Sequence, residues 1–232
     1  MEIEDLKSYS QARQDTFAIL ASGEKRDGTF VDLGAGHPEN GSNTKALEEL
    51  GWRGILCDIE TWEELAVARS QSNVILADAL DPDTDAEILK LAGEAKTIDF
   101  LSLDLEPPAL TLQRLATLPL HRVRFAIACV EHDLYRDPTG SIRAAMRGIM
   151  SSHGYRMVAA DVMMVGHSNG RMSLFPVEDW WIHPSLVDER KAILIAQTIR
   201  MTSMIEMLET IGLESIGLKS IGTNVAATGG AK

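Results

Sequence analysis

An apolar run that ends in two closely spaced glycines constrains this chain more than any other stretch. It reads Phe-Val-Asp-Leu-Gly-Ala-Gly over residues 30–36. The run predicts a buried strand, and Gly34 and Gly36 permit a sharp turn with a ligand close to the backbone. Ser42 and Asn43 then offer N-cap residues for a helix. Strand, glycine turn and helix form the first half of a nucleotide-binding βαβ unit.

The next predicted strand, residues 54–58, ends in the carboxylate of Asp58. An acid about 20 residues beyond the glycines can accept hydrogen bonds from ribose hydroxyls. The third glycine of the dinucleotide fingerprint is missing, because Glu39 stands in its place. Asp32, just before the turn, would repel phosphate and suits a cationic amino-acid ligand. S-adenosylmethionine, with an ammonium, a sulfonium and a ribose but no phosphate, fits this pattern. A tight turn in another kind of α/β protein is the weaker alternative.

The chain has 232 residues, enough for one α/β domain with a large core. We expect a single domain with a cap helix in residues 1–27, a core sheet in 28–176, a helix in 185–212 and a tail in 213–232. The net charge of -12 argues against a nucleic-acid partner. The acidic first residues do not resemble a signal peptide, and no apolar run could span a bilayer. We therefore expect a cytoplasmic protein without a membrane partner.

Predicted strands alternate with predicted helices along the chain. One strand precedes the glycine turn, and six more fall at residues 54–58, 73–77, 98–104, 124–130, 155–164 and 171–175. An Asn-Gly pair between the last two predicts a hairpin turn. This order predicts a three-layer α/β/α sandwich around a mostly parallel seven-stranded sheet that closes with a C-terminal antiparallel hairpin.

Each of the first five predicted strands ends with a carboxylate. These residues are Asp32, Asp58, Asp78, Asp104 and Glu131. Ligands of such sheets bind outside the carboxyl ends of the strands. Five acids at five successive strand ends are hard to ascribe to chance, so we expect them to surround one ligand site.

Three segments allow two interpretations each. The polar residues 8–15 could close a ligand pocket or begin a solvated helix, and composition favours the helix start. Of the adjacent Trp180 and Trp181, one could line a pocket, or the pair could anchor a loop on the sheet edge. The helix predicted over residues 187–211 carries an apolar stripe that could cover the sheet or form an interface. Because the stripe contains several methionines, which suit adaptable surfaces, we predict a homodimer.

Taken together, these motifs resemble the FkbM-type branch of class I S-adenosylmethionine-dependent methyltransferases. The resemblance covers most of residues 8–161 and is carried by residues 8–11 with Asp15, 31–38, 42–44, 51–54, Asp58, 98–106 and 130–132. It implies a Rossmann-like methyltransferase fold and O-methylation of a small hydroxylated acceptor of the sugar or secondary-metabolite type. The family usually has a glycine after the Leu-Glu pair at residues 105–106, whereas this chain has Pro107, which lacks a backbone donor.

The resemblance also implies where S-adenosylmethionine would bind. The acid and the glycines of the turn would cradle its methionine part, Asp58 would bind the ribose, and Asp78 with Ala79 would flank the adenine. Gln11 and Asp15 would close the pocket, which reverses the interpretation drawn from composition. The full predicted set is Gln11, Asp15, Asp32, Gly34, Ala35, Gly36, Ser42, Asn43, Asp58, Ile59, Asp78, Ala79 and Asp104.

The predicted catalytic residues are Asp104, Glu131 and His132. They end neighbouring predicted strands, so we expect their side chains to converge on one cleft. His132 can accept a proton at neutral pH and is the predicted general base. Asp104 and Glu131 would position the acceptor or bind Mg²⁺. Otherwise, Glu131 would cap a loop and His132 would serve only in packing.

The predicted substrate contacts are Glu106, Trp180 and Trp181. The leading function is therefore methyl transfer to a small-molecule acceptor. A catalytically silent S-adenosylmethionine-binding protein that acts through protein interaction is the alternative. A nucleotide-dependent oxidoreductase is a third hypothesis, weakened by the missing third glycine.

Overall fold

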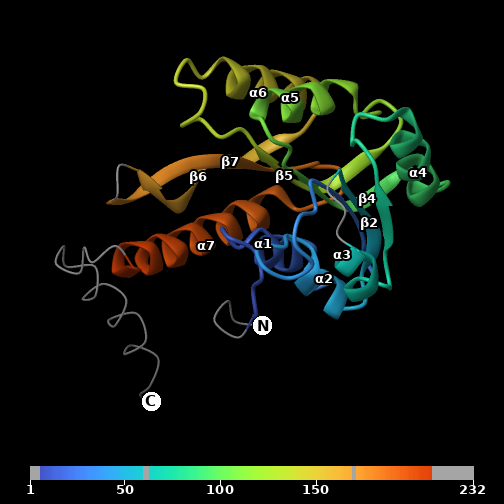
Figure 1. Cartoon of the computed structure of the whole chain (residues 1–232), viewed down its shortest axis with the longest axis horizontal. Helices are drawn as coiled ribbons and strands as arrows, with labels where there is room; N and C mark the ends of the chain where they lie inside the picture. Colours follow the sequence, from blue (N-terminus) through green and yellow to red (C-terminus); the bar gives the residue numbers. More distant parts are fainter. Residues whose placement is uncertain (1–5, 60–62, 169–170, 211–232) are drawn as a thin grey trace.

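The computed structural model describes residues 6–59, 63–168 and 171–210. Within them, seven strands form one sheet in the order β3-β2-β1-β4-β5-β7-β6 (Figure 1). The strands are β1 (Thr29–Leu33), β2 (Arg53–Asp58), β3 (Asn73–Leu76), β4 (Thr97–Leu103), β5 (Arg124–Glu131), β6 (Arg156–Ser168) and β7 (Arg171–Ile182). The helices are α1 (Gln14–Ala21), α2 (Lys45–Glu49), α3 (Glu63–Ala68), α4 (Pro82–Ala92), α5 (Pro108–Thr117), α6 (Ser141–Ser152) and α7 (Glu189–Thr210).

The first five strands pair in parallel, and β7 runs antiparallel to both β5 and β6. Leu33 of β1 pairs with Cys57 of β2 on one side and with Leu103 of β4 on the other. The carboxyl ends of these three strands therefore lie at one edge of the sheet. The chain order reverses between β1 and β4, and that reversal opens a crevice in sheets of this kind. The mostly parallel sheet with a C-terminal antiparallel hairpin is confirmed.

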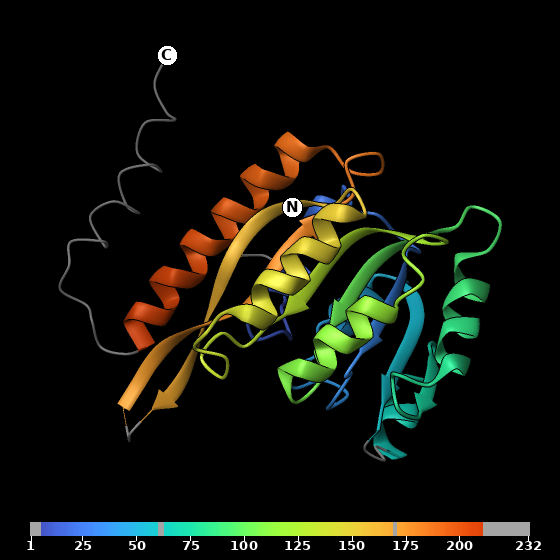
Figure 2. The same ribbon diagram turned by 90° about the horizontal axis from the view of Figure 1, so that it is seen from above.

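Two apolar cores lie on opposite faces of the sheet, because successive residues of a strand point to opposite sides. Phe30 of β1 belongs to the core beneath α1, α2 and α7, whereas its neighbour Val31 belongs to the core beneath α4, α5 and α6. Figure 1 shows α5 and α6 on one side of the sheet and α1, α2 and α7 on the other, and Figure 2 shows the view from above. This arrangement confirms the three-layer sandwich.

The hairpin strands are longer than the sequence predicted. β7 continues through Ile182, so Trp180 and Trp181 lie within the strand and not in a loop after it. They face opposite cores, and both are almost completely buried. Trp180 stacks on Phe17 of α1, with ring centroids 4.6 Å apart. Pairing with β5 extends the strand, because each tryptophan finds an apolar layer on its own face.

The predicted cap helix and the predicted C-terminal helix are both present in part. In the described part of the predicted cap region, residues 6–27, only α1 is helical, and Arg13 just before it has a left-handed φ of 64°. Helix α7 falls within the predicted C-terminal helix, and the predicted tail lies outside the described residues. No helix in the described ranges combines the length and apolar character that a membrane crossing requires.

Candidate functional site

The glycine turn after β1 has one closed side and one open side. Gly34 has φ +88°, and a Cβ placed on it would lie 1.7 Å from the backbone oxygen of Asp104. Only glycine fits there, because the turn passes directly against the end of β4. Gly36 has φ +58°, and a Cβ placed on it would meet no atom within 4 Å. The open side of the turn can therefore receive a ligand.

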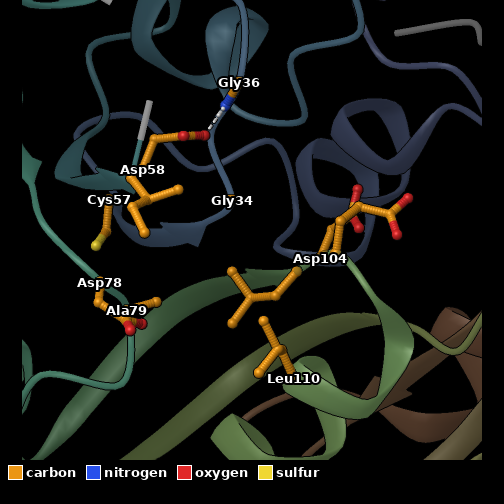
Figure 3. Close-up of a pocket in the computed structure, with 11 residues that line it drawn as sticks. Gly34, Gly36, Cys57, Asp58, Asp78, Ala79, Asp104 and Leu110 are labelled. Atoms are coloured by element: carbon orange, nitrogen blue, oxygen red, sulfur yellow. Dashed lines mark hydrogen bonds between the residues drawn. The ribbon is translucent and has the colours of Figure 1, made fainter. Parts of the chain in front are cut away.

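A cavity of about 410 Å³ lies beside this turn, at the carboxyl edge of the sheet (Figure 3). Such a volume is within the range of small-molecule sites. The residues that line it come from the ends of β1, β2 and β4, from the segment after β3 and from the start of α5. They are Gly34, Gly36, Cys57, Asp58, Ile59, Asp78, Ala79, Asp104, Leu105, Glu106 and Leu110. Eight of these eleven residues belong to the predicted site, so the structure brings together half of the sixteen predicted cofactor and substrate contacts.

Asp58 connects the end of β2 to the glycine turn. Its Oδ2 atom accepts a hydrogen bond of 2.7 Å from the backbone N–H of Gly36, as Figure 3 shows. In the segment after β3, Asp78 accepts a hydrogen bond of 2.9 Å from the backbone of Leu80. Both acids line the cavity, at the ends of the neighbouring strands β2 and β3.

The charge of the lining restricts the ligand. Asp58, Asp78, Asp104 and Glu106 contribute carboxyl groups, and no lysine or arginine is among the described lining residues. Burial raises the pKa of Asp104 to about 6, and the neighbouring acids add to this effect. Such a lining disfavours phosphate and favours a cationic ligand with hydroxyl groups. The residues therefore fit S-adenosylmethionine better than a dinucleotide.

Asp32 lies behind the turn and does not line the cavity. Its Oδ2 atom accepts a hydrogen bond of 2.7 Å from the Thr44 hydroxyl, whereas Oδ1 has no partner among the described residues. Burial raises its pKa, and the Thr44 hydroxyl opposes that rise. Asn43 donates a hydrogen bond of 3.0 Å to Ser102, the register partner of Asp32, and its own Oδ1 atom also lacks a described partner. The Ser102 side chain also interacts with Asp32 and lowers its pKa.

Arg69, which the sequence did not single out, is completely buried just after α3. Its guanidinium donates hydrogen bonds of 3.2 Å to the carbonyl of Pro38, 3.0 Å to Ser42 and 3.0 Å to Thr44. Thr44 in turn bonds to Asp32. Arg69 therefore holds the loop between the glycine turn and α2. Ser42 has a structural role in this network and does not line the cavity.

The predicted pocket-closing residues do not reach the cavity either. Asp15 is fully buried, and its carboxylate accepts hydrogen bonds from the hydroxyls of Ser8 and Ser10 and from the backbone of Tyr9. It thereby folds the segment that precedes α1. Gln11 is exposed, and this segment meets the loop after the glycine turn, where Tyr9 accepts a hydrogen bond of 3.1 Å from Gly41.

The expected convergence of the three catalytic residues is only partly present. Asp104 and Glu131 interact closely enough for their carboxyl groups to share a proton. Burial raises the pKa of both; the charge of Asp104 raises the pKa of Glu131 further, whereas the hydrogen bond from Glu131 opposes the rise at Asp104. His132 does not join them. It is 1% exposed, and its Nε2 atom lies 3.5 Å from Oδ1 of Asp161 and 3.6 Å from Oδ1 of Asp179. Successive residues of a strand point to opposite faces, so His132, which follows Glu131, faces the α6 side of the sheet. The expectation that His132 converges with Asp104 and Glu131 is therefore corrected.

A second acidic group surrounds His132. Arg147 of α6 donates hydrogen bonds of 2.7 and 2.8 Å to Asp179 and one of 2.9 Å to Asp161. Burial would raise the pKa of Asp179, but the bonds from Arg147 hold it at about 2. His132, Asp161 and Asp179 form the one cluster in the described ranges with three metal-ligand atoms close together. The predicted Mg²⁺ site at Asp104 and Glu131 is not such a cluster.

Neither predicted tryptophan contact lies at the cavity, because both side chains are buried in the cores. Glu106 does line it and is exposed. Sequence reasoning missed Glu178 and Asp133, two buried acids beside Glu131. Only the polar pair Glu178–Asp179 at the end of an apolar run could have signalled the first of them.

No protein-family model matches the chain, and no curated protein matches it in sequence. Solved structures with a similar fold include a fibrillarin pre-rRNA processing protein from Methanococcus jannaschii, at 15% identity and TM-score 0.48, covering 79% of this chain and 84% of that chain. A TehB-like SAM-dependent methyltransferase from Corynebacterium glutamicum is 13% identical, with TM-score 0.44 and coverage of 76% and 89%. The 1,6-didemethyltoxoflavin-N1-methyltransferase from Burkholderia thailandensis is 15% identical, with TM-score 0.42 and coverage of 75% and 79%. The FkbM-type resemblance therefore depends on the motifs alone.

Proposed function

We propose that this chain is an S-adenosylmethionine-dependent methyltransferase that acts on a small-molecule acceptor. One observation carries the proposal: the cavity lies between an open glycine turn and the carboxylate of Asp58, and its described lining has acids but no basic side chain. A cofactor with two positive charges and a ribose suits that lining, whereas a pyrophosphate does not.

The residues divide the binding task among the strand ends. Asp58 accepts hydrogen bonds from two ribose hydroxyls, and the open backbone at Gly36 lets the ligand approach. Asp78 and Ala79 flank the base, and Ile59, which is 72% exposed, offers it an apolar surface. When bound, S-adenosylmethionine supplies a methyl group attached to a positively charged sulfur. Asp104 contributes negative charge at the β4 end of the cavity.

Calorimetry with S-adenosylmethionine, S-adenosylhomocysteine and NAD tests the cofactor class. We expect micromolar or tighter binding of the first two and no binding of NAD. Asp58→Ala should weaken S-adenosylmethionine binding at least tenfold, since each lost charge-assisted bond contributes roughly 1.5–3 kcal/mol. Glu94→Gln, which removes an exposed charge outside the cavity, is the control. Equal affinity of wild type and Asp58→Ala contradicts the ribose contact, and binding of NAD alone supports the oxidoreductase.

A catalytically silent binding protein is the second candidate. It is favoured by one observation: Leu194 and Met201 of α7 are each 65% exposed and lie on one side of the helix. Formation of S-adenosylhomocysteine in the presence of an acceptor distinguishes the enzyme from this alternative. The motif resemblance implies a hydroxylated acceptor, whereas the carboxyl groups beside the cavity favour a cationic one.

A further inference from the structure

Three carboxyl groups form a row across three neighbouring strands, at the ends of β4 and β5 and within β7. The register of β4 and β5 pairs Leu103 with Val130, so Asp104 and Glu131 are the next residues in line. The register of β5 and β7 pairs Glu131 directly with Glu178. We call Asp104, Glu131 and Glu178 the carboxyl row. Like charges that face one another across strands are destabilising, so this row requires compensation.

No cation of the described chain supplies that compensation. No lysine, arginine or histidine nitrogen of the described residues lies within 4.0 Å of the row. Glu178 is 2% exposed, accepts a hydrogen bond of 2.7 Å from the Trp180 indole and also interacts with the Gln14 side chain. Burial raises its pKa to about 8. The row therefore holds protons that a bound cation could replace.

A fourth acid adds an unpartnered oxygen. Asp133 is 2% exposed, has a left-handed φ of 43°, and its Oδ1 atom has no partner among the described residues. Its carboxylate acts electrostatically on both Glu131 and Asp104, so it faces the row. Oδ2 of Asp133 lies 3.5 Å from Nε of Arg136, an exposed side chain that also pairs with Glu106. The Asp133 carboxylate can thus accept a proton shared with Glu131, or a donor that takes the place of that proton.

The carboxyl row begins at the cavity. Asp104 lines the cavity, and its backbone contacts the glycine turn at Gly34. Figure 3 shows Asp104 on the opposite side of the cavity from Asp78. From Asp104 the row continues along the sheet edge toward α1, where Gln14 interacts with Glu178. A molecule bound to the row would therefore lie next to a cofactor in the cavity.

We propose that the methyl acceptor is an amine, bound as its ammonium ion by the carboxyl row and Asp133. This inference depends on the proposed methyltransferase function and names its substrate class. A hydroxyl group carries no charge, so the row would keep its protons beside it, whereas an ammonium can take the place of those protons and donate N–H bonds to the ionised carboxylates. In the described ranges, the ligand atoms of the row do not converge closely enough to hold a metal ion. An organic cation is therefore a better occupant of the row than a metal ion.

Methylation of an amine requires that its ammonium ion first lose a proton. The ammonium gives one proton to a carboxylate of the row, which frees the nitrogen lone pair. The lone pair forms the N–C bond while the C–S bond breaks, and that electron pair stays on sulfur. The products are a methylated ammonium and a neutral thioether, and the carboxyl group returns its proton to solvent. A carboxyl group with a raised pKa suits this proton transfer at neutral pH.

The test compares amines with hydroxyl analogues of the same size. The protein is loaded with S-adenosylhomocysteine, and calorimetry measures binding of 1,4-diaminobutane against 1,4-butanediol, tyramine against tyrosol, and tryptamine against tryptophol. We expect at least one amine to bind tenfold or more tightly than its alcohol. With S-adenosylmethionine, mass spectrometry should find the new methyl group on nitrogen.

Charge-removing variants localise the binding. Glu131→Gln, Glu178→Gln and Asp133→Asn should each weaken amine binding about tenfold while S-adenosylhomocysteine affinity stays within about twofold; Glu94→Gln is the control. If S-adenosylhomocysteine binds but no amine binds, or if alcohols bind and are methylated instead, the amine inference is overturned and the methyltransferase proposal stands. If S-adenosylhomocysteine does not bind, both are overturned. The comparison of wild-type ligands decides the matter even if a variant fails to fold.

Discussion

Nε of Arg69 donates a hydrogen bond of 2.5 Å to Oε2 of Glu48, and the two side chains are 0% and 4% exposed. Because Arg69 also bonds to the loop after the glycine turn, this buried ion pair connects that loop with α2 and with the segment after α3. Glu48 further accepts a hydrogen bond of 2.7 Å from Ser72. The pair is thus the centre of a polar network within the apolar layer.

Arg69→Met should lower the free energy of unfolding by about 3–5 kcal/mol, because it leaves Glu48 buried without its cation. Denaturant titration followed by circular dichroism measures the loss. The exposed pair of Lys90 and Glu87 provides the control, and Lys90→Met should cost less than about 1 kcal/mol. Adding Glu48→Leu to Arg69→Met should restore much of the stability. Equal losses in the buried and exposed pairs would show that the network has no special role.

Gly36→Ala should impair cofactor binding without unfolding the protein. Gly36 and Gly93 have nearly identical φ values, +58° and +57°, and a Cβ on either would meet no atom within 4 Å. Gly36→Ala should therefore lose about 1–2 kcal/mol of stability through backbone strain. Gly93→Ala should lose at least as much, because its ψ of -154° lies in a region that essentially only glycine adopts. Only Gly36 lines the cavity, so calorimetry should show weaker S-adenosylmethionine binding for Gly36→Ala alone. Unchanged affinity in that variant would place the ligand elsewhere.

The strand order and most of the cavity lining were predictable because both depend on local patterns. Apolar runs mark the parallel strands, and the acid or glycine that follows each run marks the edge where they end. Asp58, Asp78 and Asp104 were found in this way. Local pattern does not show which side a residue faces once a strand ends, so the expected convergence of His132 with Glu131 was wrong.

The remaining site residues depend on contacts between distant segments. Glu178 belongs to the carboxyl row only because β7 runs past the predicted end of its strand to pair with β5. The backbone N–H groups of His132 and Asp133 both donate hydrogen bonds to the carbonyl of Val177. Two residues therefore face one, which is a β-bulge, and the bulge turns Asp133 toward the row. Arg69 likewise acquires its role from loops more than 20 residues away. Such pairings leave no periodicity in the sequence.

His132→Ala should leave S-adenosylmethionine affinity unchanged and lower turnover less than tenfold, because its ring faces Asp161 and Asp179 and not the cavity. Loss of a buried ring between two acids should reduce the free energy of unfolding by about 1–3 kcal/mol. Steady-state kinetics with denaturant titration separates the two effects, and Glu131→Gln is the comparison that should lose turnover. A hundredfold loss of turnover at preserved stability would restore His132 as the general base.

Homodimer formation through α7 stays a prediction of the sequence, and the exposed Leu194 and Met201 make it testable. Light scattering at micromolar concentration should give the mass of a dimer for wild type and of a monomer for Leu194→Glu and Met201→Glu. Each charge would have to be buried at the interface without a partner. Lys191→Glu, at another exposed position of α7, is the control for charge alone. A wild-type monomer would reject the dimer.

Glu178 should make the protein less stable as the pH rises. Its pKa is raised from 4.5 to about 8 by burial, so the folded state holds a proton that the unfolded state releases above about pH 4.5. The folded state therefore binds more protons between about pH 4.5 and 8, and the free energy of unfolding falls with pH by up to about 1.4 kcal/mol per unit. Below pH 4.5 both states hold the proton, and above pH 8 both have released it, so the contribution levels off.

Glu178→Gln removes this titration while it keeps the shape of the side chain and an acceptor for the Trp180 indole. Denaturant titrations at pH 5, 6, 7 and 8 should show a shallower fall in stability for Glu178→Gln than for wild type. Asp104, whose pKa is raised to about 6, contributes in the same direction at lower pH, so a part of the slope should persist in the variant. Glu94→Gln should keep the full wild-type slope. Parallel slopes in Glu178→Gln and wild type would mean that Glu178 is ionised in the folded protein at pH 7 and that a cation already neutralises the row.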